Sequence, residues 1–85
     1  MKNILMLCLS VFVLFRSGAK MEYKDAAFYE WHDGARKNPF ALNEWVNPII
    51  IHNEWLVLFD KNGNQIKCIA GARVEDVIGK ESFSN

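Results

Sequence analysis

A run of apolar residues near the N-terminus follows a short positively charged start. The run covers Ile4 to Phe15, and small and polar residues follow it up to Ala19. A positive start, an apolar segment and a small-x-small end, here at Ser17 and Ala19, are typical of a secretory signal peptide. We therefore expect residues 1–19 to form a hydrophobic signal helix that is cleaved after Ala19.

Two other interpretations of this apolar run stay open. In one of them, the run is an uncleaved membrane anchor. A helix over its 12 residues covers about 18 Å, whereas a hydrocarbon core is about 30 Å thick, so the anchor is short. Arg16 lies inside the proposed cleavage region, and together with Lys20 it weakens the charge asymmetry that directs translocation. In the other interpretation, the run is a buried element of the fold.

Further along the chain, apolar residues recur at helical spacing. Tyr23, Ala27 and Trp31 stand four residues apart, which predicts one apolar stripe on a helix. Asn38 followed by proline is typical of a helix start, and Val74, Val77 and Ile78 have the spacing of a short helical stripe. The pattern predicts three helices, over Met21–Asp33, Pro39–Val46 and Ala72–Ile78.

Between the last two predicted helices the hydrophobic period changes to two. Ile49 to Phe59 alternates as a strand does, and Asn62-Gly63 separates it from a second apolar run that ends before Gly71. Asn-Gly between two such runs predicts a β-hairpin with a two-residue turn. This turn pairs Phe59 with Ile66, Leu58 with Lys67, Val57 with Cys68, Leu56 with Ile69 and Trp55 with Ala70.

The hairpin has two faces, and the register assigns each residue to one of them. We expect the first face to lie inward against the helices; it holds Trp55, Val57, Phe59, Ile66, Cys68 and Ala70. We expect the other face, with Leu56, Leu58 and Ile69, to stay uncovered. The predicted fold class is α+β, a small antiparallel hairpin or three-stranded sheet packed against two or three short helices and preceded by the signal helix.

Composition narrows the class of protein. The chain has 85 residues, of which 51% are hydrophobic, and its formal net charge is zero. This balance excludes intrinsic disorder and argues against nucleic-acid binding, which relies on excess lysine and arginine. Residues 20–85 hold eight basic and ten acidic residues, a net charge of −2. They form one domain of a size that is marginally stable without disulfides or a partner.

Candidate catalytic and metal-binding residues are few. His32 lies next to Glu30 and Asp33, and His52 stands two residues before Glu54, but neither group has a nucleophile or the spacing of a metal site. We predict no enzyme activity, no metal and no cofactor. Cys68 is the one cysteine of residues 20–85; we expect it to be buried, with an intermolecular disulfide as the alternative.

The uncovered sheet face suggests a partner surface. We predict that a protein partner or a second copy binds there, and that tryptophan contributes because it is enriched at interface hot spots. The predicted partner-binding residues are Leu56, Leu58, Ile69 and Trp45. The predicted function is that of a small exported, non-enzymatic binding protein of the inhibitor or immunity type, periplasmic or secreted; a membrane-tethered accessory subunit that uses residues 4–15 as its anchor is the alternative.

The stretch from Trp55 to Ile78 resembles the C-terminal unit of thioredoxin-like proteins, in which a hairpin is followed by a glycine and a helix. The resemblance covers this part of the chain alone. The chain has no Cys-x-x-Cys pair, and His52-Asn53-Glu54 stands where those proteins carry a cis-proline. The resemblance therefore implies, as a further alternative, a degenerate thioredoxin-like module without redox activity.

Overall fold

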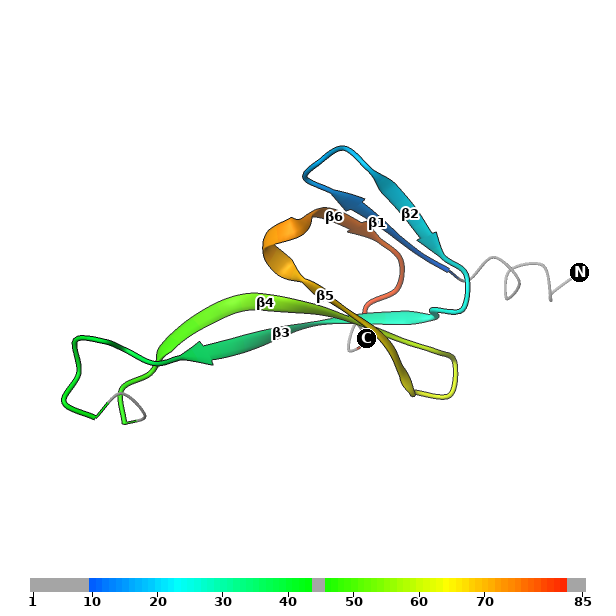
Figure 1. The fold of residues 1–85 in the computed structure, drawn as a ribbon. Coiled ribbons are helices and arrows are strands. Elements are labelled where there is room, and N and C mark those ends of the chain that lie inside the picture. The colour runs from blue at the N-terminus through cyan, green and yellow to red at the C-terminus, as the bar shows by residue number, and fades with distance from the viewer. Residues whose placement is uncertain (1–9, 44–45, 83–85) are drawn as a thin grey trace, which may run out of the picture.

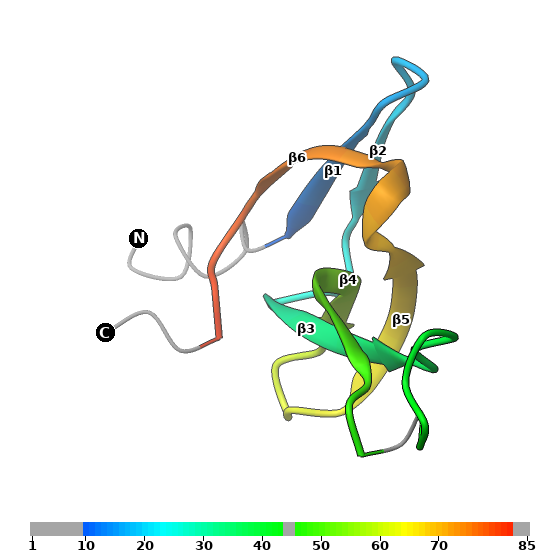
Figure 2. The same cartoon turned by 90° about the vertical axis from the view of Figure 1, so that its left-hand side faces the viewer.

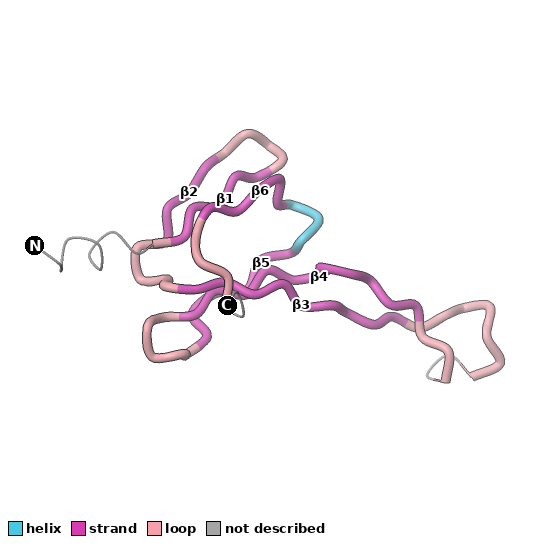
Figure 3. Tube along the Cα trace, turned by 180° about the vertical axis from the view of Figure 1, so that it is seen from behind, coloured by secondary structure: helices cyan, strands magenta, loops and turns pink. Residues whose placement is uncertain are grey.

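The fold consists almost entirely of strands. The computed structural model describes residues 10–43 and 46–82 of the chain, and in these ranges one turn of 3-10 helix is the one helical element (Figures 1 and 3). The elements are β1 (Val11–Phe15), β2 (Lys20–Tyr23), β3 (Phe28–Arg36), β4 (Ile49–Phe59), β5 (Gln65–Ala70), η1 (Gly71–Arg73) and β6 (Val74–Ile78). The predicted α+β fold is therefore wrong.

The strands form two antiparallel sheets of three strands each. The first sheet has the order β2-β1-β6 and the second has the order β3-β4-β5. Hairpins join β1 to β2, β3 to β4 and β4 to β5, while β6 returns to pair with β1. Figure 2 shows β6 crossing above the second sheet to reach β1 after the turn of η1.

The hydrophobic core lies between the two sheets. β1 is the central strand of its sheet, and its alternate residues Val11, Val13 and Phe15 are buried. These side chains belong to one cluster with residues of the other strands and of the β2–β3 connection, namely Ala26, Leu56, Leu58, Ile69 and Val74. Each large aliphatic side chain buried in this way contributes about 1.5–3 kcal/mol of hydrophobic stabilisation.

The predicted signal helix is not present in the described part of the apolar run. Residues 11–15 form a strand with buried side chains on alternate positions, so this part of the run is an element of the core. Residues 1–9 lie outside the described ranges. Cleavage after Ala19 and export stay predictions, and no helix in the described residues is long and apolar enough to cross a membrane.

The predicted helix over Met21–Asp33 is wrong as well. Lys20–Tyr23 forms β2, and Phe28–Arg36 forms β3. Tyr29 and Trp31 do face the core, but they do so as alternate residues of a strand that pair with Leu58 and Leu56. Aromatic side chains favour strands, and pairing with β4 satisfies the backbone of β3 along its length.

The other two predicted helices are also replaced. Asn38 accepts the backbone N–H of Phe40 through its side chain at 3.0 Å, as a helix cap does. Of the predicted helix over Pro39–Val46, the described residues 39–43 and 46 form turns and bends, and residues 44–45 lie outside the described ranges. The third prediction covers η1 and β6: Val77 pairs with Val13 and Ile78 with Phe12. Pairing with β1 therefore determines the extended form of β6.

The β4–β5 hairpin confirms most of the predicted register. Trp55 to Leu58 pair with Ala70 to Lys67 as expected. The turn is one residue longer than predicted, because Asp60 pairs with Asn64 through a backbone bond of 2.9 Å and Phe59 faces Gln65 in place of Ile66. Gly63 alone in this turn has a positive φ, 85°.

The assignment of inner and outer faces on this hairpin is reversed. Leu56, Leu58 and Ile69 are buried in the core, whereas Trp55 and Ile66 are each 41% exposed. The cover over the inner face is the sheet built on β1, which comes from the segment predicted to be removed. Val57 is the exception on the outward face, since it is buried too.

The β3–β4 hairpin extends beyond the rest of the molecule. The last pair between β4 and β5 is Trp55 with Ala70, but β3 and β4 continue to pair as far as Arg36 and Ile49. We call residues 34–51, a range that includes the loop between β3 and β4, the arm. Figure 1 shows the arm projecting away from β1, β2 and β6, along the long direction of a chain that measures 61 × 28 × 20 Å.

Candidate functional site

A β-bulge separates the arm from the body of the second sheet. The β3–β4 register shifts between His32 and Gly34, and Asn53 opposite this shift has a φ of 54°. Positive φ is uncommon for a residue other than glycine, and asparagine tolerates it best. A bulge bends its strand, so this one sets the direction of the arm relative to the rest of the second sheet.

Asp33 holds the bulge in place. One oxygen of its carboxylate accepts the backbone N–H of Asn53 at 2.9 Å, and the other lies 3.2 Å from Nδ1 of His52. The pKa of Asp33 is lowered from its usual range, mainly by the bond from the Asn53 backbone. The carboxylate is therefore ionised at neutral pH while it caps the bulge.

Two glycines allow the neighbouring chain to come close to this bulge. A methyl group at Gly71 would overlap the backbone oxygen of Asn53, and one at Gly34 would overlap the carboxylate of Glu54. The Glu54 carboxylate instead lies across Gly34 and accepts two bonds from Arg36, at 2.6 and 3.2 Å. The Glu54 side chain is only 12% exposed.

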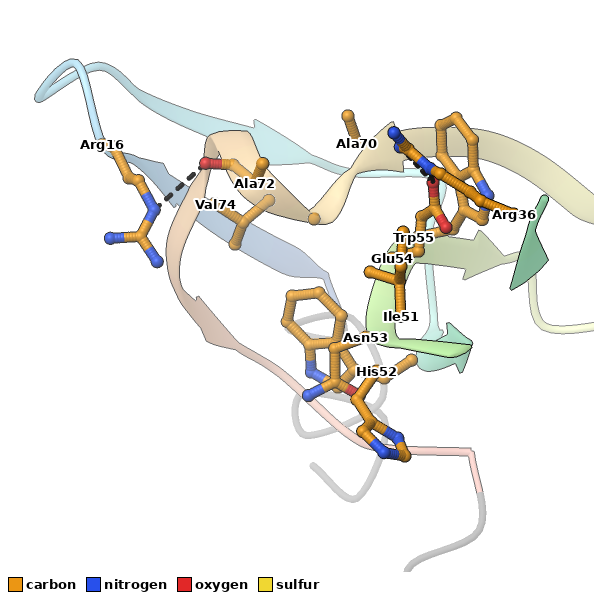
Figure 4. Close-up of a pocket in the computed structure, with 12 residues that line it drawn as sticks. Arg16, Arg36, Ile51, His52, Asn53, Glu54, Trp55, Ala70, Ala72 and Val74 are labelled. Atoms are coloured by element: carbon orange, nitrogen blue, oxygen red, sulfur yellow. Dashed lines mark hydrogen bonds and ion pairs between the residues drawn. The ribbon is translucent and has the colours of Figure 1, made fainter. Parts of the chain in front are cut away.

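An open groove of about 430 Å³ lies where the arm meets the end of β5. Trp31, Ile51, Trp55 and Val74 supply its apolar walls, and Arg16 and Arg36 stand at its sides. Figure 4 shows Arg36 and Glu54 beside Trp55, with Arg16 on the other side bonded to the backbone oxygen of Ala72. Arg16 also contacts Glu75 at 3.3 Å. Since both guanidinium groups have carboxylate partners, the groove favours an uncharged, apolar group.

The arm has an open strand edge next to this groove. Beyond Trp55 no strand of the described chain pairs with β4 on the side away from β3. The residues along this open edge are Ile49, Ile50, Ile51 and His52, and three of these are β-branched and uncharged. Such an edge readily accepts another extended strand, and soluble proteins usually protect it with charges or proline. The groove and this edge, residues 49–52, form the candidate site.

The loop of the arm also exposes apolar side chains. Nine large hydrophobic residues of the described chain are exposed, and five of them lie in the arm. These five are Phe40 (94% exposed), Leu42 (110%), Val46 (67%), Ile49 (44%) and Ile50 (52%). Exposed apolar groups concentrated on one projecting element are typical of an interaction site.

The described residues contain no group of three or more His, Cys, Asp or Glu that could hold a metal ion. Glu30 lies 2.6 Å from Nε2 of His32, and this bond lowers the pKa of the Glu30 carboxyl group. Burial raises the pKa of Tyr29, with smaller effects from Glu81 and Asp76. None of these groups lies in the groove, so they supply no chemistry there.

The residues predicted to bind a partner do not come together on an exposed surface. Leu56, Leu58 and Ile69 are core residues, and Trp45 lies outside the described ranges. Cys68 is a free, exposed thiol, so its expected burial is wrong; a disulfide to another chain stays a prediction.

Sequence reasoning missed the groove and the open edge. The Ile49-Ile50-Ile51 run between Pro48 and a polar segment could have shown the edge, because it is too apolar for a solvated strand. The groove had no such signal, since Arg16 and the residues of η1 contribute to it from distant parts of the sequence. No protein-family model, curated protein or solved structure matches the chain.

Proposed function

We propose that this protein is a small, non-enzymatic binding protein that takes up an extended polypeptide segment at the open edge of β4. The observation that carries the proposal is the open edge of residues 49–52, whose three isoleucines carry no charge and of which Ile49 and Ile50 are exposed. In strand addition, backbone hydrogen bonds supply affinity and pockets for alternate side chains supply specificity. The edge supplies the backbone groups.

The groove supplies the pocket. It begins where the edge ends, and its lining includes Ile51, Trp55 and the residues at the turn out of β5. Trp55 is 41% exposed, which leaves part of its indole ring available to a ligand. A bound segment that runs toward Asn53 therefore ends beside an apolar wall, and we expect it to place a large uncharged side chain there.

The opposite edge of the arm is a poorer site for strand addition. Arg36 lies on this edge and Asp33 immediately precedes the arm, and charged side chains of this kind protect an edge. Export and membrane tethering both stay predictions.

A peptide-display selection tests the proposal. Random peptides are selected on the full chain, with an Ile50→Lys variant for counter-selection and an Ile66→Lys variant as the matched control on β5. We expect peptides with alternating apolar residues that bind the wild type and the control but not Ile50→Lys. Hydrogen exchange should then show protection of the amides of residues 49–53. Peptides that bind all three proteins equally, or protection elsewhere, would contradict the proposal.

A further inference from the structure

We propose that the open edge of β4 pairs with the same edge of a second copy of the chain, so that the protein is a two-fold symmetric dimer. This inference rests on the proposed function, because it names the partner of the same edge. In an interface of this type each copy presents one patch to the same patch of the other. The edge therefore has to be complementary to itself.

Strand geometry limits the registers that such a dimer can adopt. Directly opposite residues in an antiparallel pair either both point their backbone groups at each other or both point them away. A two-fold axis consequently passes between one residue and its own copy. Centred on Ile50, the pairing sets Ile50 against Ile50 of the second copy and Ile49 against Ile51 of the second copy.

This register covers the apolar edge completely. All three isoleucines then pair only with isoleucines, and two of them, Ile49 and Ile50, are exposed in the single chain. β-branched pairs of this kind stabilise a sheet. A register centred on Ile51 instead sets Ile49 against Asn53, whose φ of 54° interrupts the strand.

The ends of the segment fit the same register. Pro48 has no N–H to donate, and in this arrangement it lies opposite His52, the first residue past the last regular β3–β4 pair on the arm. Beyond Pro48 the second copy has to leave the edge, because Gly71 of the first chain already lies against Asn53, whose backbone oxygen a methyl group at Gly71 would overlap. The paired segment therefore runs from Pro48 to His52 in each copy.

The dimer is tested by the mass of the full chain in solution. Sedimentation and light scattering over a concentration series should give a dimer for the wild type and for Ile66→Lys, and a monomer with unchanged circular dichroism for Ile50→Lys. Both positions are exposed, at 52% and 41%, so neither variant should unfold. A monomeric wild type, or a dimer that persists in Ile50→Lys, overturns the inference.

A disulfide test checks the register. In a Cys8→Ser, Cys68→Ser background, Ile50→Cys should oxidise to a covalent dimer, because opposite residues have Cα atoms about 4.5–5.5 Å apart, within disulfide range. Ile66→Cys is the control and should stay monomeric under the same oxidation. Equal crosslinking of the two variants overturns the inference. A monomeric wild type that still binds selected peptides leaves the proposed function standing, whereas a monomer that binds none contradicts both.

Discussion

The carboxylate of Asp33 accepts the backbone N–H of Asn53 at 2.9 Å, across the point where the arm leaves the second sheet. This bond compensates the ladder bond that the bulge interrupts, and it holds Asn53 at a φ of 54°. The direction of the arm therefore depends on a side chain of the neighbouring strand.

Replacing Asp33 with alanine should loosen the arm while the core stays folded. The Asn53 N–H loses its acceptor, so its amide and those of the arm should exchange faster with deuterium, whereas amides of β1 and β6 should not change. Asp33→Asn is the matched control, because its amide oxygen can still accept the bond. Equal exchange in alanine and asparagine variants would show that the bond does not hold the bulge.

The same bond predicts a pH dependence. Because the pKa of Asp33 is lowered in the folded chain, its ionised form favours folding above the ordinary aspartate pKa, and this contribution is lost as the pH falls through the lowered pKa. The amide signal of Asn53 in an NMR titration should shift in that acidic range. Asp33→Asn should remove the transition, and a transition that persists there would assign it to another group.

Gly63 should resist replacement for a conformational reason. Its φ is 85°, and the space that a side chain would occupy at this position is open. Gly63→Val should therefore lower the free energy of unfolding by about 1–2 kcal/mol through backbone strain alone. Gly63→Asn should cost less, because asparagine tolerates this conformation. Chemical denaturation of both variants measures the difference, and equal stability of all three proteins would refute the turn geometry.

Leu56 and Ile50 should respond oppositely to the same substitution. Leu56 is fully buried, and a lysine there places a charge in the core at a cost of several kcal/mol, which a domain of marginal stability does not tolerate. Leu56→Lys should therefore abolish the cooperative thermal transition, while Ile50→Lys should keep it. A folded Leu56→Lys variant would mean that the β1 sheet does not cover this face.

Removal of residues 1–19 should prevent folding. The truncation deletes β1, the central strand of the first sheet, together with three buried side chains, Val11, Val13 and Phe15. We expect residues 20–85 to show no dispersed amide spectrum, and deletion of residues 1–9 alone serves as the control. A folded fragment of residues 20–85 would instead support cleavage after Ala19, which N-terminal sequencing of the natural protein tests directly.

Two errors in the predicted fold, the helix over Ala72–Ile78 and the uncovered face at Leu56, have one common origin. The apolar run that contains Val11 and Val13 has the composition of a signal peptide, and a fold without this run lacks the strand with which β6 pairs. Without that strand, Val74, Val77 and Ile78 fit a helical stripe equally well, and no other segment covers Leu56. Pairing between segments far apart in the sequence determines the conformation of these elements. The spacing of apolar residues within one segment carries no information about such pairing.

The local features were more accessible to sequence reasoning. The pairing of Leu56 with Ile69 and of Val57 with Cys68 followed from a turn motif and from alternation, both of which act over a few residues. The candidate site was not accessible in the same way. Its edge is open only because β5 ends at Ala70, and its groove needs Arg16 and Val74 to meet, which requires the whole fold.

The return of β6 to β1 also determines when the molecule can fold during its synthesis. Val13 and Val77 are partners in the first sheet, so the second of them is made long after the first. Until then β1 has only β2 beside it, and an isolated two-stranded hairpin is marginally stable at best. Contacts between residues so far apart also slow folding. Until Val77 has been synthesised, β1 therefore lacks one of its two neighbouring strands, and during this period a chaperone or a targeting factor has access to it.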